Sequence, residues 1–100
     1  MRILATQKNK LMPQVGRSVQ IDSQKIALFQ TSDGAIYALE DYCPLTDSPI
    51  LEGVVSGTYL YEPMRDYKIS LVDGKVQEPD TGQLKTYSVF LDGDDVYLEV

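Results

Sequence analysis

Two short stretches, Tyr42-Cys43-Pro44-Leu45 and Tyr61-Glu62-Pro63-Met64-Arg65, decide how this sequence folds. Sixteen residues, 46 to 61, separate Leu45 from Glu62. The prolines and glycines of the surrounding region are too dense for long strands, because proline lacks the N–H that a central strand needs and glycine weakens a strand interior. The region therefore predicts two protruding loops, residues 43–49 and 62–66, joined by short strands around residues 54–55 and 58–61.

The rest of the chain alternates short apolar runs with turn signals, and no stretch holds a helical period. Asp-Gly pairs mark several of the turns, since they supply the positive φ angles of tight hairpins. Strands are predicted at residues 2–6, 17–21, 25–30, 35–40, 67–72, 75–77, 87–91 and 96–100. The pattern indicates one all-β domain spanning residues 1–100, a small antiparallel β-barrel or sandwich.

Composition excludes several classes of function. The formal net charge is −6 and the nine basic residues are scattered, which argues against nucleic acid as a partner. No apolar run is long enough for a signal peptide or a membrane span, so no membrane partner is expected. A single cysteine permits no intrachain disulfide, which favours the cytoplasm.

The chain contains no histidine. That absence removes histidine-based acid–base catalysis, the Ser-His-Asp and Cys-His arrangements and the usual zinc sites. The spacing of the carboxylates Asp41, Asp47 and Glu52 does not match a metal-binding or acid–base motif. We expect these three side chains to be solvated. An enzyme acting alone is thus not expected.

Several stretches resemble one known family, and these are residues 26–29, 33–39, 42–45, 49–57, 85–89 and 96–98. The most specific is the Pro-[Leu/Ile]-x-x-Gly-x-Val segment that begins at Pro49. From about residue 11 to residue 100, the chain resembles the small subunit of assimilatory NAD(P)H nitrite reductase. The resemblance implies a Rieske-like [2Fe-2S] domain fold in which the two protruding loops are the former ligand loops.

A Rieske centre holds its [2Fe–2S] cluster with two thiolates and two imidazoles, spaced Cys-x-His and Cys-x-x-His. In this chain the corresponding positions are Cys43, Leu45, Glu62 and Arg65, so one ligand is kept and three are replaced. Leucine offers no lone pair and arginine is a permanent cation. Glutamate is a poor replacement for a thiolate at iron–sulfur clusters. We therefore expect no cluster and no metal in this chain.

The resemblance also implies a partner. It implies a cytoplasmic, non-catalytic subunit beside a large catalytic subunit that carries FAD, sirohaem and a [4Fe–4S] cluster and reduces nitrite to ammonium. The candidate contact surface consists of Leu45, Ile50, Met64 and Tyr67, and the alternative is that these side chains pack inward. A stand-alone Rieske-like β-barrel interaction module is the second hypothesis, and a ferredoxin-type electron carrier is excluded by the missing ligands.

Two further hypotheses concern the loop side chains. Glu62 and Arg65 are opposite in charge and three residues apart, so they either pair across the former metal position or both point into solvent. Cys43 is either a reactive loop thiol or an inherited, partly buried small residue. No basic residue lies nearby in sequence to lower the pKa of its thiol, which favours the second interpretation.

Overall fold

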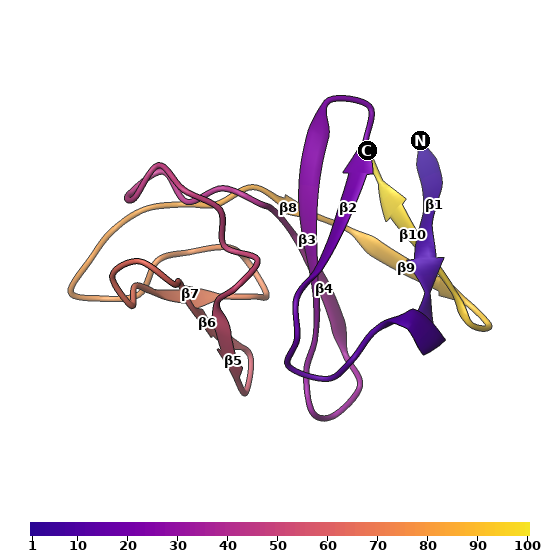
Figure 1. Cartoon of the computed structure of the whole chain (residues 1–100), viewed down its shortest axis with the longest axis horizontal. Helices are drawn as coiled ribbons and strands as arrows, with labels where there is room; N and C mark the ends of the chain where they lie inside the picture. The colour runs from indigo at the N-terminus through magenta and orange to yellow at the C-terminus, as the bar shows by residue number, and fades with distance from the viewer.

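The computed structural model describes all of residues 1–100, and they form three antiparallel sheets (Figure 1). The first sheet has the strand order β1-β10-β9, the second β2-β3-β4-β8 and the third β5-β6-β7. The bounds are β1 Arg2–Gln7, β2 Arg17–Ile21, β3 Gln24–Gln30, β4 Ile36–Glu40, β5 Val54–Ser56, β6 Tyr59–Tyr61, β7 Lys68–Ser70, β8 Thr86–Tyr87, β9 Val89–Asp92 and β10 Asp95–Glu99. The predicted all-β fold is confirmed, and a single 3₁₀ turn at Lys8–Lys10 interrupts it.

The second sheet lies between two hydrophobic cores. Alternate residues of a strand point to opposite faces, so the run Ile26-Ala27-Leu28-Phe29 in β3 supplies both cores. Ile26 and Leu28 pack in a nine-residue cluster that also holds Val96 of β10. Ala27 and Phe29 pack in an eleven-residue cluster that includes the buried residues of β5 to β7. A central strand that is buried on both faces explains why this run is continuously apolar.

The third sheet carries the two loops. The first loop runs from β4 to β5 and the second joins β6 to β7, so both lie at the same end of the molecule. Figure 1 shows this sheet at the opposite end from the chain termini, which lie near each other beside β1 and β10. The eleven-residue core lies beneath the loops and contains Cys43 and Ile50 from the first of them.

Two predicted strands differ from the structure. The predicted strand at residues 87–91 is divided at Ser88, because Tyr87 pairs with Ala38 of β4 whereas Val89 pairs with Leu98 of β10. The predicted strand at residues 75–77 is reduced to two isolated bridges, one between Val76 and Ile69 and one between Lys75 and Gln83. The chain thus changes sheet at Ser88. None of its helical turns has the length and apolar character needed to cross a lipid bilayer.

Candidate functional site

The first loop is closed by two backbone hydrogen bonds at Cys43. The N–H of Cys43 donates to the carbonyl of Ser48 at 2.9 Å, and the N–H of Asp47 donates back to the carbonyl of Cys43 at 2.8 Å. Asp47 has a φ of 51°, in the left-handed region that aspartate tolerates better than most residues. The loop therefore turns tightly over five residues and buries the side chain of Cys43 completely.

The second loop repeats this backbone pattern at Glu62. Its N–H donates to the carbonyl of Tyr67 at 3.0 Å, and the N–H of Asp66 donates back to the carbonyl of Glu62 at 3.1 Å. Asp66 has a φ of 60°. Cys43 and Glu62 thus occupy equivalent positions in two loops of the same backbone design, and both side chains are fully buried.

The carboxylate of Glu62 is held by main-chain and side-chain donors. Its Oε2 accepts the N–H of Met64 at 3.0 Å, and its Oε1 accepts the N–H of Arg65. The hydroxyl of Thr46, in the first loop, donates to Oε2 at 3.4 Å. These donors compensate for burying a carboxylate, which is costly without hydrogen bonds. The two loops therefore face each other and touch at Thr46 and Glu62.

The hypothesis of a Glu62–Arg65 side-chain pair is wrong. The salt bridge of this structure joins the N-terminal amino group of Met1 to Glu99, and Arg65 is exposed without a carboxylate partner. The opposite hypothesis is also wrong for Glu62, because that side chain has no exposed surface. Glu62 pairs instead with the main chain of Arg65.

Cys43 and Leu45 differ in their exposure. Cys43 is a free thiol with no exposed surface, packed in the eleven-residue core, as the interpretation of an inherited small residue predicts. Leu45 is 39% exposed, and a Cβ built on Gly82 would lie 3.5 Å from its Cδ1. Leu45 is therefore partly covered by the segment that precedes β8.

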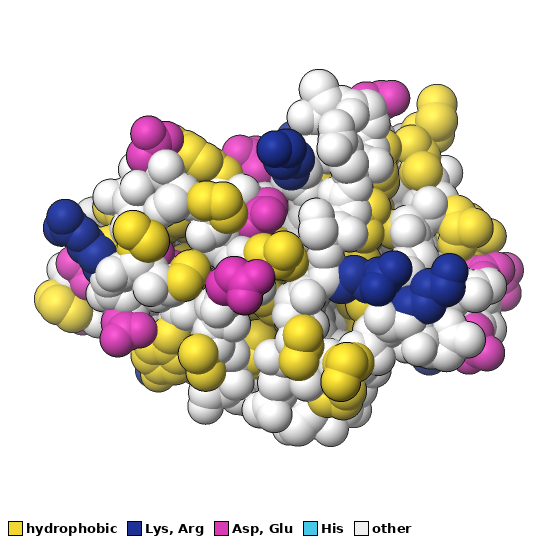
Figure 2. Space-filling view, in the orientation of Figure 1, with side chains coloured by type: hydrophobic (Ala, Val, Ile, Leu, Met, Phe, Trp, Pro, Cys, Tyr) yellow, Lys and Arg dark blue, Asp and Glu magenta, His cyan; other side chains and the backbone are white.

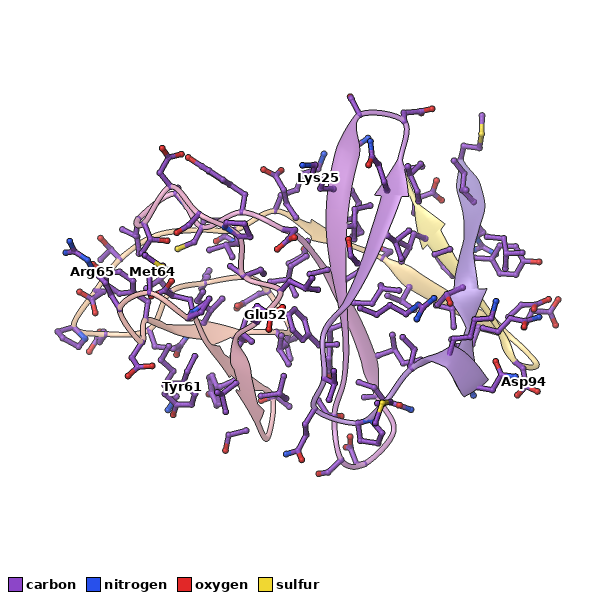
Figure 3. The ribbon with its side chains drawn as sticks, viewed as in Figure 1. Lys25, Glu52, Tyr61, Met64, Arg65 and Asp94 are labelled. Carbon is purple, nitrogen blue, oxygen red and sulfur yellow. The ribbon has the colours of Figure 1, made fainter.

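The predicted contact surface is only partly on the surface. Met64 in the second loop is 67% exposed and Leu45 in the first loop is 39% exposed, whereas Tyr67 is half-buried against the core. Ile50 is fully buried, so its place in that surface is corrected: its side chain packs inward and touches no solvent. Figure 3 places Met64 and Arg65 at one end of the molecule and Asp94 at the other, and Figure 2 shows several apolar side chains at the loop end.

Asp41 holds the base of the first loop, a role that the sequence prediction of a solvated carboxylate missed. Its Oδ1 accepts the N–H of Ile50 at 2.8 Å and the N–H of Leu51 at 3.0 Å. No local rule relates an aspartate to amides nine and ten residues away, so no sequence signal pointed to it. Asp41 thereby fixes the point at which Ile50 enters the core.

Asp47 is also engaged rather than simply solvated. The hydroxyl of Tyr42 donates to its Oδ1 at 2.8 Å. This hydrogen bond, followed by partial desolvation and nearby negative charge, raises the pKa of the Tyr42 phenol above its usual value. The hydrogen bond between Tyr42 and Asp47 thus joins the two ends of the first loop on its solvent-exposed side.

The loop side chains do not fit a [2Fe–2S] cluster. Of the four ligand positions, only Cys43 offers a thiolate donor, since Leu45 has no lone pair and Arg65 is a cation. The carboxylate of Glu62 is already bound by the amides of its own loop. A cluster would need three further donors that this chain does not supply.

The chain matches one known protein family over almost its whole length. A family model described as the Rieske-like [2Fe-2S] domain matches residues 3–99. A crystal structure provisionally described as a nitrite reductase NADPH small subunit is 27% identical, with a TM-score of 0.89 over 100% of this chain and 99% of that one. No curated protein sequence matches the chain.

Two more distant structures share the fold. One is provisionally described as the NADH-dependent nitrite reductase small subunit of Mycobacterium tuberculosis, at 19% identity and a TM-score of 0.89, covering 98% of this chain and 93% of that one. The other is the ferredoxin of carbazole 1,9a-dioxygenase from Nocardioides aromaticivorans, at 17% identity and a TM-score of 0.88, covering 98% and 96%. The chain belongs to the Rieske-like [2Fe-2S] domain family.

Proposed function

We propose that this chain is the small, non-cluster-binding subunit of a cytoplasmic, assimilatory NAD(P)H-dependent nitrite reductase, which reduces nitrite to ammonium. In the assembled enzyme, FAD, sirohaem and the [4Fe–4S] cluster belong to the large catalytic subunit. This chain docks on that subunit and supports it without catalysing a step itself.

The observation that carries the proposal is the match to the nitrite reductase small subunit structure, which extends over the full length of both chains. The same fold also serves a dioxygenase ferredoxin, so the fold alone does not choose between these roles.

The ligand positions favour a subunit that transfers no electrons. Electron transfer through this fold depends on a cluster held by thiolates and imidazoles. Here Glu62 is committed to hydrogen bonds with Met64 and Arg65, and the chain has no imidazole to offer. The role that remains is binding.

The exposed apolar side chains of the loop end provide a surface for that binding. Met64 and Leu45 expose large apolar groups at the tips of two rigidly hydrogen-bonded loops. Interface cores are depleted in charge and enriched in side chains such as methionine. We place the contact with the large subunit at Leu45, Met64 and the exposed part of Tyr67.

Co-purification tests the proposal. The chain is produced with a tag, together with the sirohaem-containing large subunit encoded in the same genome, and the complex is analysed by size-exclusion chromatography and native mass spectrometry. We expect a stoichiometric complex in which all visible absorption comes from the large subunit. A chain that elutes alone beside an active reductase contradicts the proposal and supports the stand-alone interaction module.

A further inference from the structure

The second loop forms a small concavity of backbone amides with its own anion inside it. The N–H groups of Met64 and Arg65 both point at the carboxylate of Glu62. Successive backbone N–H groups in a turn form such anion-binding concavities, often called nests. We infer that the Glu62 carboxylate acts as the internal anion that organises both loops, so that this chain keeps the shape of a cluster-binding site without a cluster.

Burial makes this carboxylate necessary to the loop. A fully buried carboxylate is stable only where several donors satisfy it, and no buried side-chain oxygen or nitrogen of this structure lacks a partner. Hydrogen bonds to an ionised acceptor are stronger than neutral ones. Removing the carboxylate would therefore leave the amides of Met64 and Arg65 facing a space with no acceptor.

The first loop does not need an anion of its own. The position equivalent to Glu62 is Cys43, and the polar groups inside this loop bond to one another: the hydroxyl of Ser48 donates to the hydroxyl oxygen of Thr46 at 2.9 Å. The hydroxyl of Thr46 then donates to Glu62 at 3.4 Å. A short chain of hydrogen bonds thus runs from the first loop into the carboxylate of the second.

This arrangement makes the loop end independent of iron. The exposed side chain of Met64 and the guanidinium of Arg65 are borne on the residues whose amides Glu62 binds. Their positions therefore follow from a hydrogen-bonded carboxylate rather than from a metal or its oxidation state. The inference holds for the isolated chain, whatever partner it binds, so its failure is distinct from a failure of the proposed function.

Amide hydrogen exchange measured by NMR tests the inference. In the wild-type chain we expect the amides of Met64 and Arg65 to be protected although their loop is at the surface. Glu62→Gln keeps one acceptor oxygen and turns the other into an NH2 donor, so one of the two backbone amides faces a donor instead of an acceptor. We expect exchange of that amide to rise about tenfold or more, the factor for losing a hydrogen bond to a charged group. The matched control is Glu52→Gln, which changes an exposed carboxylate and should leave both rates unchanged.

Either of two exchange results overturns the inference. One is exchange of the Met64 and Arg65 amides at unprotected rates in the wild-type chain, which needs no variant and so applies even where Glu62→Gln fails to fold. The other is unchanged protection of both amides in a folded Glu62→Gln chain. Treatment of the wild type with an iron chelator and dithionite should leave its NMR spectrum unchanged. Chemical-shift changes confined to the two loops after this treatment would also overturn the inference.

Chemical rescue gives a second, independent measurement. Glu62→Ala leaves the amide pair beside a space the size of a small carboxylate. We expect formate to raise the thermal unfolding midpoint of this variant more than chloride at the same ionic strength, and to have no such effect on the wild type. Equal responses of the two proteins to formate would contradict the inference.

Discussion

The backbone N–H of Met64 donates to the carboxylate of Glu62 at 3.0 Å, two residues earlier in the same loop. This contact places a buried negative charge beneath an exposed apolar side chain. It also means that the second loop is shaped by residues within it.

The first prediction concerns the hydroxyl that connects the loops. Thr46→Val removes the donor to Glu62 at nearly constant volume, and the Ser48 hydroxyl, which loses the Thr46 hydroxyl as an acceptor, still has the carbonyl of residue 46 at 3.1 Å. We expect the free energy of unfolding to fall by about 0.5–1 kcal/mol, the net value of one partly buried hydrogen bond. Urea unfolding measures this free energy. Thr46→Ser, which keeps a hydroxyl, should lower it by less than Thr46→Val does. Equal losses in the two variants would mean that the methyl group, not the hydroxyl, stabilises the loops.

The second prediction concerns the base of the first loop. Asp41→Ala removes the acceptor for the amides of Ile50 and Leu51. We expect a loss of about 1–2 kcal/mol in the free energy of unfolding, because two amides lose a charged acceptor at a half-buried site. Asp80→Ala, at an exposed carboxylate with no side-chain hydrogen bond, is the control. A loss no larger than that of the control would contradict the role given to Asp41.

The third prediction concerns acid stability. The hydroxyl of Thr31, and next the N–H of Ala35, hold the pKa of the Asp33 carboxyl below its usual value. A carboxyl whose pKa is lower in the folded state stabilises the fold above its unfolded pKa, and this contribution disappears as the pH falls through the folded pKa. We expect wild type to exceed Asp33→Asn in stability at neutral pH, with the difference shrinking below about pH 4. Unfolding curves at several pH values measure it, and a difference that grows on acidification would contradict the assignment.

The fourth prediction concerns the proposed interface with the large subunit. Met64→Asp places a charge at the tip of the second loop, where Met64 is 67% exposed. Burying an unpaired carboxylate in an interface is costly, so we expect the dissociation constant of the complex to rise roughly tenfold or more.

The matched control for Met64→Asp lies at the other end of the molecule. Leu91 is 49% exposed on β9, and Leu91→Asp should leave the affinity unchanged. Calorimetry or surface plasmon resonance distinguishes the two variants. Weakening by Leu91→Asp alone would place the interface at the terminal sheet rather than at the loops.

The sequence predicted the strands and the loop positions well, for local reasons. Asp33-Gly34 marks the turn between β3 and β4, and Gly34 has the positive φ of 92° that such a turn requires. Proline and glycine likewise limited strands in the middle of the chain. These signals act over a few residues, so a single sequence reveals them.

The features that sequence reasoning missed depend on contacts between distant residues. The sequence suggested either a side-chain pair with Arg65 or solvent for Glu62, because its actual donors are backbone amides and a threonine sixteen residues earlier, which no charge pattern encodes. The division at Ser88 depends on which of two sheets each residue joins. Ile50 is a candidate contact residue by sequence, but its side chain is buried and its N–H bonds to Asp41 nine residues earlier, a contact that no local pattern predicts.

The most direct test of the central claim is anaerobic reconstitution with iron and sulfide, followed by visible absorption and EPR of the reduced protein. The wild-type chain should acquire no [2Fe–2S] signal. The triple variant Leu45→His, Glu62→Cys and Arg65→His supplies the missing donors on the same two loops and should acquire one, which serves as the positive control. A stoichiometric [2Fe–2S] spectrum from the wild-type chain would contradict the account.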